Sequence, residues 1–424
     1  MKVLWVVNFA LPEVSESDAA QMPFGGWVGA MLEQAKRIPG LSIGLAMKAP
    51  VQSLVSMSVD GVQCYWIPMS AKNKYDIGQE DCDRVLQGFL PDILHIEGTE
   101  QAHSLRFIKS WSGKNVVSLQ GIINGYEQYE YGGLKLPELL CTPSLKVIVF
   151  GLSMWANKRF LFRPRLIVER KTLAEAQNFI GRTTWDRAHS YWRNPSANYY
   201  SCNRVLREPF YRESWSSDRR RQYCIFVGNG ASPRKGLHFV LKAISILKVE
   251  YPKTRLQVAG AKPFPSSLKD WKKFVGYPAY VRHLLTKWKL TDHVDFLGLL
   301  TEVEMARQMS LAHLFVLPSV IENSPNTLGE AMALGVPCVS AYSGGVADMA
   351  VDGEEALFYR TDDPIHLAYQ IKRIFDDSEL AADLSIAGRK RAMNTHHPQE
   401  NLRRLLNAYE KILERPIHRN GDGD

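Results

Sequence analysis

Short hydrophobic runs alternate with longer stretches of helical periodicity along almost the whole chain. The first half contains such runs at residues 3–7, 64–67, 93–96, 116–119 and 179–180. The second half contains them at residues 224–227, 255–258, 293–297, 314–317, 337–340 and 356–359. Strands that alternate with crossover helices are typical of parallel sheets. The pattern therefore predicts an α/β protein with two Rossmann-like, doubly wound domains.

A polar, arginine-rich segment separates the two halves. Residues 204–223 contain Pro209 and the run 214–221, whose composition suits a linker better than the interior of a helix or strand. We therefore place the first domain at residues 1–205 and the second at residues 206–395.

The end of the chain carries its own periodic pattern. Apolar side chains recur every three or four residues between Leu402 and Leu413, which predicts an amphipathic helix that must pack against another element. We expect residues 396–415 to pack back on the first domain. Residues 416–424 are expected to form a polar tail.

Charge and cysteine content narrow the class of protein. The 424 residues carry a formal net charge of +8, which permits a nucleotide diphosphate, a phospholipid surface or nucleic acid as partner. Nucleic acid is excluded as the expected partner because the chain has no recognised nucleic-acid module. The six scattered cysteines form no CxxC pair and no metal-ligand cluster, so we expect reduced thiols and no metal. The apolar start at residues 3–7 is too short for a signal or a membrane span, which predicts a cytoplasmic location.

The most informative segment, residues 316–337, reads as strand, loop, helix and stop. Ser324 is predicted to cap the helix and Pro325 to be its first residue, while Gly335 followed by Pro337 ends it. Free N–H groups and the positive end of the helix dipole would then face the loop. This arrangement is a natural seat for a diphosphate.

Two acids and two cations accompany this seat. Glu322 lies just before the helix, and Glu330 lies within it, where a carboxylate can accept two hydrogen bonds from a cis-diol such as ribose. Residues 225–237 join a buried strand to a glycine-rich loop with Arg234 and Lys235, cations that can clamp phosphates. The alternative is that all four are ordinary solvated charges.

Together these segments resemble the retaining glycosyltransferases of the GT-B fold, the large group 1 or family 4 set, with members in polysaccharide assembly. The resemblance is most specific at the paired Glu322 and Glu330 within residues 322–340. Residues 226–236 and 294–298 fit the same family in the same order. The resemblance implies two domains facing each other across a cleft, the first binding the acceptor and the second the donor.

The same resemblance implies the reaction. A sugar would move from a UDP- or GDP-sugar to a hydroxyl of a glycan or lipid-linked saccharide, with retention of configuration and without metal or other cofactor. Such reactions build surface polysaccharides, including capsule and lipopolysaccharide, or glycoconjugates. We keep two alternatives: a catalytically idle nucleotide-sugar-binding subunit of a polysaccharide-assembly complex, and a nucleotide-sugar epimerase.

By resemblance, Arg234 and Lys235 would hold the diphosphate, Glu322 would face the sugar ring and stabilise the reaction, and Glu330 would bind the ribose. Gly298 and Leu299 would lie beside the base. The other residues expected around the donor are Gly25, Gly26, Gly230, Asn323, Ser324, Pro325, Asn326 and Thr327.

One position departs from the family. Many relatives have a histidine after the strand at residues 116–119, where this chain has Gln120. Glutamine can hydrogen-bond a sugar but cannot transfer a proton at neutral pH, so we assign Gln120 a positioning role at the catalytic centre. His95 is a candidate replacement with Glu97 beside it, although a buried core histidine is the alternative.

Two further residues are expected to contact acceptor or sugar. Arg182 and Asp186 follow the strand at residues 179–180 and would point into the cleft, unless they form an ion pair within the domain.

Two stretches mix aromatic and basic residues. Residues 147–165 and 268–274, with Tyr277 and Tyr280 after the second stretch, have a composition that suits an anionic membrane surface. We therefore expect peripheral association with the inner face of the cell membrane. The alternative is a core helix with a basic connector, followed by a solvated surface helix.

Overall fold

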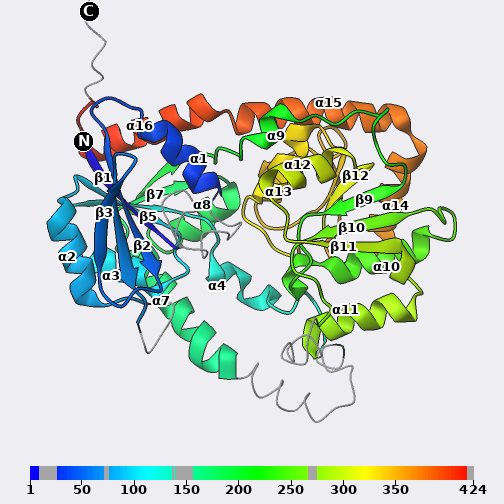
Figure 1. Cartoon of the computed structure of the whole chain (residues 1–424), viewed down its shortest axis with the longest axis horizontal. Helices are drawn as coiled ribbons and strands as arrows, with labels where there is room; N and C mark the ends of the chain where they lie inside the picture. The colour runs from blue at the N-terminus through cyan, green and yellow to red at the C-terminus, as the bar shows by residue number, and fades with distance from the viewer. Residues whose placement is uncertain (9–25, 71–75, 136–137, 139–155, 266–274, 418–424) are drawn as a thin grey trace, which may run out of the picture. The chain divides into compact units, whose positions relative to one another are not determined.

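The computed structural model describes residues 1–8, 26–70, 76–135, 138, 156–265 and 275–417. These residues form two compact units. Colour in Figure 1 runs by residue number from blue at the N-terminus to red at the C-terminus. The chain passes between the units more than once. Unit 1 comprises residues 1–125, 162–206 and 396–424, and unit 2 comprises residues 126–161 and 207–395.

Unit 1 is built on one eight-stranded sheet. All neighbouring strands are parallel except the antiparallel pair β3 and β4 at one edge. In sheet order the strands are β3 (Val55–Val59), β4 (Val62–Pro68), β2 (Ser42–Ala49), β1 (Lys2–Val7), β5 (Ile93–Glu97), β6 (Lys114–Ser118), β7 (Asn178–Gly181) and β8 (Asn198–Ser201). β1 and β5 are almost entirely buried, as strands covered on both faces must be.

The helices of unit 1 follow the strands in sequence. They are α1 (Gly26–Ala35), α2 (Gln79–Phe89), α3 (Ala102–Ser110), α4 (Ile123–Tyr126), α7 (Arg163–Glu175), α8 (Thr184–Tyr191) and α16 (Pro398–Leu413). The last helix buries Leu405, Leu406, Tyr409 and Ile412. The Trp5 indole of β1 donates a hydrogen bond to the Tyr409 hydroxyl at 2.9 Å, so this helix is fixed to the middle of the sheet.

Unit 2 contains a six-stranded, fully parallel sheet. In sheet order its strands are β11 (Val294–Gly298), β10 (Arg255–Ala259), β9 (Cys224–Val227), β12 (Leu314–Leu317), β13 (Cys338–Ala341) and β14 (Leu357–Tyr359). The chain starts at β9, builds outward through β10 and β11, and returns to the other side of β9 with β12. The loops after β9 and β12 therefore meet at a switch point, the usual place for a ligand in such a sheet.

Two groups of helices accompany this sheet. They are α9 (Pro209–Arg212), α10 (Leu237–Leu247), α11 (Gly276–Lys287), α12 (Glu302–Ser310), α13 (Asn326–Leu334), α14 (Pro364–Asp376) and α15 (Ser378–Thr395). Helix α10 packs against α11 and α14, whereas α13 packs against α9, α12 and α15 (Figure 1). A parallel sheet accompanied by two separate helix groups, one around α10 and one around α13, is the doubly wound arrangement that the sequence predicts.

The predicted fold class is confirmed: both units are α/β with parallel sheets. β9 and β12 begin and end where the hydrophobic runs predict. β2, β3 and β8 were not predicted. β2 contains Gly44 and Lys48 within its apolar positions, and β3 is an exposed edge strand, so neither gives a continuous hydrophobic run.

The segment after residue 125 differs from the expected first domain of residues 1–205, because residues 126–161 cluster with unit 2. The reason is local packing. The Arg234 guanidinium lies 5.0 Å from the centre of the Tyr126 ring, and the His238 Nε2 lies 3.2 Å from the Gly132 carbonyl oxygen. Gly132 also approaches the Pro233 carbonyl so closely that a Cβ atom there would lie 2.2 Å from its oxygen.

Two smaller expectations concern cysteines and membranes. The described cysteines are Cys64, Cys82, Cys202, Cys224 and Cys338, and all five are buried free thiols, as expected. Burial raises the pKa of Cys64 to about 12, which keeps this thiol protonated. No helix in the described ranges combines the length and the apolar character needed to cross a bilayer.

Candidate functional site

The loops after β9 and β12 are joined directly in unit 2. The Val320 amide donates a hydrogen bond to the Arg234 carbonyl at 2.9 Å. Gly236 has a φ of 70°, and a Cβ atom at this position would lie 1.9 Å from the Pro318 carbonyl oxygen. Only glycine combines this left-handed backbone with such a close approach. Residues 234–236 are thereby fixed against residues 318–320.

This junction brings together the predicted cations and the first predicted acid. Arg234 and Lys235 lie in a short 3₁₀ turn, Pro233–Lys235, just before α10. The Lys235 Nζ lies 2.5 Å from Oε1 of Glu322. Arg234 lies 3.8 Å from a Glu130 oxygen and stacks on Tyr126. The two cationic side chains keep about a third of their surface exposed, so both can reach a ligand.

Electrostatics keep Glu322 ionised. Burial alone would raise the pKa of its carboxyl, but the charge and hydrogen bond of Lys235, a hydrogen bond from Ser319 and the charge of Arg234 outweigh burial. The pKa of Glu322 is therefore held below its ordinary value. At neutral pH the Glu322 carboxylate is therefore ionised, and its neighbours Lys235 and Arg234 are cations of the kind that bind phosphate.

The helix after this loop begins one residue later than predicted. α13 starts at Asn326, and Pro325, with φ −70° and ψ 118°, is the residue before its first turn. The expectation that Ser324 caps the helix was therefore wrong, because the extended ψ of Pro325 shifts the first helical residue forward. The predicted end is confirmed: Gly335 has a φ of 78° and lies just after the last helical residue.

Glu330 is held by a residue that the sequence did not predict. Its side chain is 3% exposed, and the Arg207 guanidinium donates to both of its oxygens, from Nε to Oε1 at 2.8 Å and from Nη2 to Oε2 at 2.9 Å. Arg207 in turn lies 4.8 Å from the centre of the Phe210 ring. No spacing rule connects residues 123 positions apart, so a local pattern gave no signal for this pair.

The remaining residues expected around the donor occupy varied positions. Gly230 leaves no room for a side chain, since a Cβ atom would lie 2.6 Å from Leu237. Gly298 has a φ of 84°, and Leu299 beside it is 68% exposed. Those near α13 divide into Asn323 and Ser324, which are buried, Pro325 before the helix, and Asn326 and Thr327 in its first turn.

The expected glycine pair near the start of the chain is only partly described. Gly25 lies outside the described residues, and Gly26 is the first residue of α1 in unit 1. Its backbone is helical.

His95 in unit 1 is a buried core histidine. Its Nδ1 lies 2.5 Å from the Tyr409 hydroxyl and its Nε2 lies 2.7 Å from the Ser118 hydroxyl, so both ring nitrogens have partners inside the unit. Burial lowers the pKa of His95 to about 4. Glu97 is equally buried, and its two carboxylate oxygens accept hydrogen bonds from Nη1 and Nη2 of Arg204 at 3.1 and 2.7 Å. This placement does not support a sugar contact by either residue.

Gln120 follows β6, and its backbone is held by Arg182. Nη2 of Arg182 donates to the carbonyl oxygens of Leu119 at 2.9 Å and Gln120 at 3.1 Å. Asp186 is fully buried and accepts hydrogen bonds from the Arg182 amide at 3.0 Å and the Tyr199 hydroxyl at 2.6 Å. Arg182 and Asp186 therefore shape the end of β6 and β7 within unit 1.

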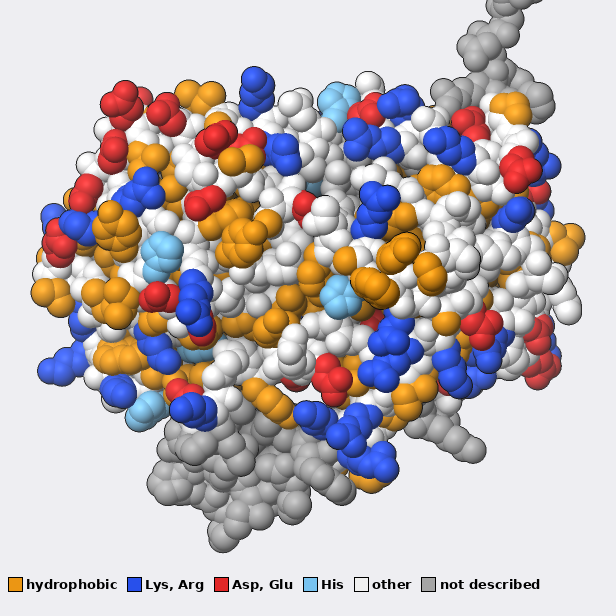
Figure 2. All heavy atoms as spheres, turned by 180° about the vertical axis from the view of Figure 1, so that it is seen from behind, with side chains coloured by type: hydrophobic (Ala, Val, Ile, Leu, Met, Phe, Trp, Pro, Cys, Tyr) orange, Lys and Arg blue, Asp and Glu red, His pale blue; other side chains and the backbone are white. Residues whose placement is uncertain are grey.

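The two stretches that were predicted to face a membrane are only partly described. Tyr277 and Tyr280 are buried in the core of unit 2, so the expectation that they add to a surface stretch was wrong. Residues 268–274 lie outside the described residues, as do residues 147–155. Phe160, 62% exposed, follows Lys158 and Arg159 at the surface. On the face drawn in Figure 2, basic and acidic side chains are interspersed.

Comparison with known proteins finds a family match that includes this site. Residues 207–391, which include all four predicted charges, match the model for glycosyl transferases group 1. This segment, less than half of the chain, is similar to that family and is named the group 1 domain. It contains the Arg207–Glu330 pair as well as the Lys235–Glu322 pair.

Curated relatives of the group 1 domain are bacterial glycosyltransferases. An uncharacterized glycosyltransferase of Bacillus subtilis, YqgM, is 31% identical over 181 residues, which are 43% of this chain and 47% of that protein. A GDP-mannose-dependent phosphatidylinositol monomannoside mannosyltransferase of Mycolicibacterium smegmatis is 24% identical over 38% of this chain and 41% of its own length. The matched segments thus span less than half of these relatives.

Solved structures match the whole chain. Sucrose-phosphate synthase of Thermosynechococcus elongatus superimposes with a TM-score of 0.71 at 14% identity, covering 97% of this chain and 99% of that one. HepE of Anabaena, solved in complex with UDP, gives a TM-score of 0.66 at 14% identity, covering 97% and 100%. The group 1 domain is therefore part of a chain with the GT-B fold.

Proposed function

We propose that this protein transfers a sugar from a nucleoside-diphosphate sugar to a hydroxyl of a saccharide acceptor. The observation that carries the proposal is the contact between Lys235 and Glu322 at the switch point of unit 2. It unites a cation suited to phosphate with an ionised acid suited to sugar hydroxyls. Group 1 glycosyltransferase relatives of the same segment support this reading.

The donor diphosphate would lie between Arg234, Lys235 and the first turn of α13. When the sugar–phosphate bond breaks, negative charge grows on the leaving diphosphate and positive charge grows on the sugar ring. Fixed cations and helix N–H groups stabilise the first charge, and the Glu322 carboxylate stabilises the second. These residues supply the charge without a metal, and we propose transfer with retention of configuration.

The nucleoside would be held through Glu330. Each carboxylate oxygen has two lone pairs, and Arg207 uses one on each oxygen. The others remain suited to the two ribose hydroxyls. Arg207 is a positioning residue here, because it fixes the plane of the carboxylate without itself meeting the ribose.

UDP and GDP are the two bases to be compared first. HepE is solved with UDP and with UDP-glucose, whereas the Mycolicibacterium relative is named as GDP-mannose-dependent. That relative also acts on a lipid-linked saccharide according to its name. A saccharide or lipid-linked acceptor of surface polysaccharide or glycoconjugate assembly, met at the inner face of the membrane, fits the exposed Phe160 beside Lys158 and Arg159.

The first test is calorimetric titration of the full chain with UDP, GDP, ADP and CMP. A nucleoside diphosphate should bind, and Arg234→Ala should weaken it about tenfold or more. Arg219→Ala, which removes an exposed arginine of the same unit, is the matched control and should leave the affinity unchanged. If none of the four nucleotides binds the wild type, the donor proposal fails.

Turnover is tested separately. With the nucleotide fixed, release of the free nucleoside diphosphate from its sugar conjugates is followed with a panel of saccharide acceptors. The anomeric configuration of the product by NMR tests retention, and activity in excess EDTA tests metal independence. Donor binding without release from any acceptor would leave a binding subunit rather than an enzyme.

A further inference from the structure

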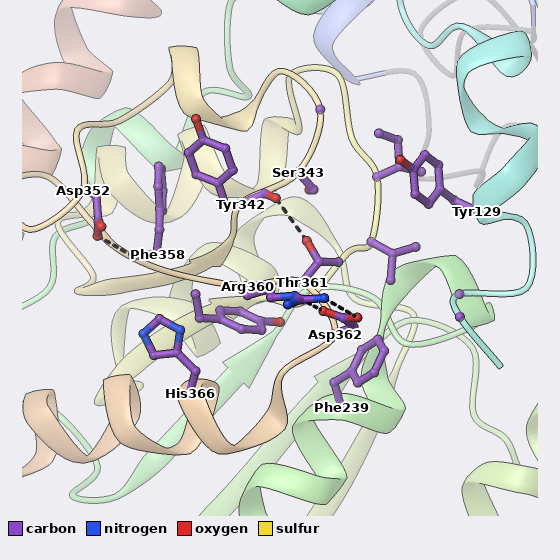
Figure 3. A pocket seen from close by; sticks show the side chains of 16 residues that line it. Tyr129, Phe239, Tyr342, Ser343, Asp352, Phe358, Arg360, Thr361, Asp362 and His366 are labelled. Atoms are coloured by element: carbon purple, nitrogen blue, oxygen red, sulfur yellow. Dashed lines mark hydrogen bonds and ion pairs between the residues drawn. The ribbon is translucent and has the colours of Figure 1, made fainter.

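Unit 2 contains a cavity of about 660 Å³ beside the ends of β13 and β14. Figure 3 shows it from close by. Its walls combine residues of the β13–α14 region with Phe239 of α10 and with Tyr129. The volume lies within the range of small-ligand pockets.

The cavity adjoins the donor site but does not include its charges. Ile321 and Gly344 line it, while Lys235 and Glu322 do not. The Gly345 amide donates to the Glu322 carbonyl at 3.0 Å, and a Cβ atom on Gly344 would lie 2.0 Å from that oxygen. The loop that carries Glu322 therefore forms part of the wall of this cavity.

Aromatic rings form much of the cavity wall. Tyr342 is 64% exposed and meets Phe358 edge-on, with ring centres 5.7 Å apart. Tyr129 and Phe239 contribute from outside the β13–β14 region (Figure 3). The Thr361 hydroxyl donates a hydrogen bond to the Tyr342 backbone carbonyl at 3.1 Å, which fixes the backbone of this residue. The exposed Tyr342 ring offers a flat apolar surface. The C–H face of a sugar ring is flat and apolar in the same way.

One polar group in the wall has no partner. Tyr359 lines the cavity at 1% exposure, and its hydroxyl forms no hydrogen bond with any described residue. Buried hydroxyls are normally satisfied, so this one asks for an explanation. A hydroxyl group entering from the cavity is a partner of the right chemistry, since hydroxyls both donate and accept.

His366 of α14 adds a second polar group. The Gln370 Nε2 lies 3.2 Å from the His366 Nε2, and the Gln370 Oε1 accepts a hydrogen bond from Arg373 at 3.0 Å. The amide nitrogen of Gln370 can only donate, so His366 Nε2 is the acceptor of this contact. The imidazole thereby adds a polar ring to the cavity lining.

The charges around the cavity argue against a phosphate. Asp352 and Asp362 line it with Arg360, and Arg360 is paired with Asp362 at 2.8 Å. Among the described residues of the lining, two carboxylates accompany one arginine, and none of the others is a lysine or arginine. A neutral polyol that donates hydrogen bonds to carboxylates suits this set better than an anion does.

We propose that this cavity is a binding site for a neutral saccharide unit, stacked on Tyr342 and hydrogen-bonded at Tyr359. The proposal rests on the proposed function, because a glycosyltransferase meets saccharides as acceptors and products. The site lies in unit 2 but outside the donor seat, so it would hold part of the acceptor or of the growing product next to the Glu322 loop.

The test is saturation-transfer NMR on the full chain with methyl α-glycosides of glucose, galactose, mannose and N-acetylglucosamine, with UDP and GDP added to occupy the donor seat. At least one glycoside should receive saturation on its ring protons, with both nucleotides present as well as without them. Tyr342→Ala should raise its dissociation constant about tenfold. Tyr369→Ala removes an exposed tyrosine that lies elsewhere in unit 2, on α14, and should not change the dissociation constant.

A second variant protects the test against misfolding. Tyr359→Phe keeps the ring and removes only the unpartnered hydroxyl, so the melting temperature of the free protein should be unchanged while glycoside affinity falls about threefold. Saturation of no glycoside, displacement of the glycoside by nucleotide, or equal affinity in all three variants would each overturn the proposal. Nucleotide binding in the same samples reports on the donor seat independently, so failure of one site is distinguishable from failure of the other.

Discussion

Unit 1 and unit 2 each bury a glutamate against an arginine or lysine, yet the two regions differ in what remains exposed. In unit 1, Glu97 and Arg204 are 3% and 9% exposed, and His95 beside them has partners at both nitrogens. In unit 2, Glu322 is 13% and Lys235 is 30% exposed. The Glu97–Arg204 pair of unit 1 is closed to solvent, whereas the Lys235–Glu322 pair of unit 2 is open to a ligand.

The comparison shows that residue type and place after a strand are not enough to define a site. Glu97 ends a parallel strand and Glu322 follows one, and both are held below their ordinary pKa by a neighbouring cation that outweighs the effect of burial. What separates them is access. The Glu97–Arg204 pair contributes to the interior of the fold, whereas the partly exposed Lys235 can exchange Glu322 for a substrate.

The largest effect should come from breaking the closed pair. Arg204→Ala leaves the Glu97 carboxylate buried without its guanidinium, which should cost about 3–5 kcal/mol of stability. Urea denaturation, with hydrogen exchange of β1 and β5 as the report on unit 1, measures it. Arg403→Ala on the exposed side of α16 is the control and should leave the stability almost unchanged. A cost for Arg204→Ala as small as that of the control would mean that the pair is not closed.

Acid should reveal the closed region next. Burial lowers the pKa of His95 to about 4, below the ordinary value near 6.5. The unfolded chain therefore binds the proton first, so this stability is complete above about pH 6.5 and is lost as the pH falls toward 4, by up to about 3 kcal/mol.

Several buried histidines contribute to the loss of stability as the pH falls. His103 and His396 lie in the same unit, and burial lowers their pKa values in the same direction. His95→Asn should therefore make the loss of stability between pH 6.5 and 4 shallower without abolishing it. Denaturation midpoints at several pH values measure this, and an unchanged slope would count against a buried neutral His95.

Breaking the open pair should change activity more than stability. Lys235→Ala removes a partly exposed cation, so the unfolding free energy should fall by only about 1 kcal/mol. The proposed role at the leaving diphosphate predicts a loss of about a hundredfold in kcat/KM. Steady-state kinetics with the identified donor, alongside Lys390→Ala as an exposed-lysine control, make the comparison. A stability loss as large as that of Arg204→Ala would erase the distinction between the two units.

The smallest effect concerns the support of Glu330. Arg207→Ala should weaken nucleotide binding about tenfold, because the carboxylate loses its fixed orientation. Glu330→Ala should weaken binding broadly, whatever sugar the donor carries. In a double-mutant cycle the two losses should be strongly non-additive. Nucleotide affinity that is unchanged in both variants would remove Glu330 and Arg207 from the donor site.

The sequence predicted well where the information was local. The hydrophobic runs at β9 and β12 have the right ends, and Gly335 ends α13 as expected, because each depends on neighbouring residues. It missed β2, whose Gly44 and Lys48 interrupt the apolar run. A tertiary contact explains Gly44: a Cβ atom there would lie 2.6 Å from the Phe89 ring, so the glycine makes room for a helix.

The sequence by itself determined the two parallel sheets, the switch between β9 and β12, and the positions of Glu322 and Glu330 along the chain. Only the tertiary structure decided which cation pairs with each glutamate and how much of the pair solvent can reach. Arg204 reaches Glu97 across 107 positions, and Arg207 reaches Glu330 across 123. Such partners are chosen by the packing of distant segments, because the cost of burying a charge depends on what surrounds it in space and not on its neighbours in sequence.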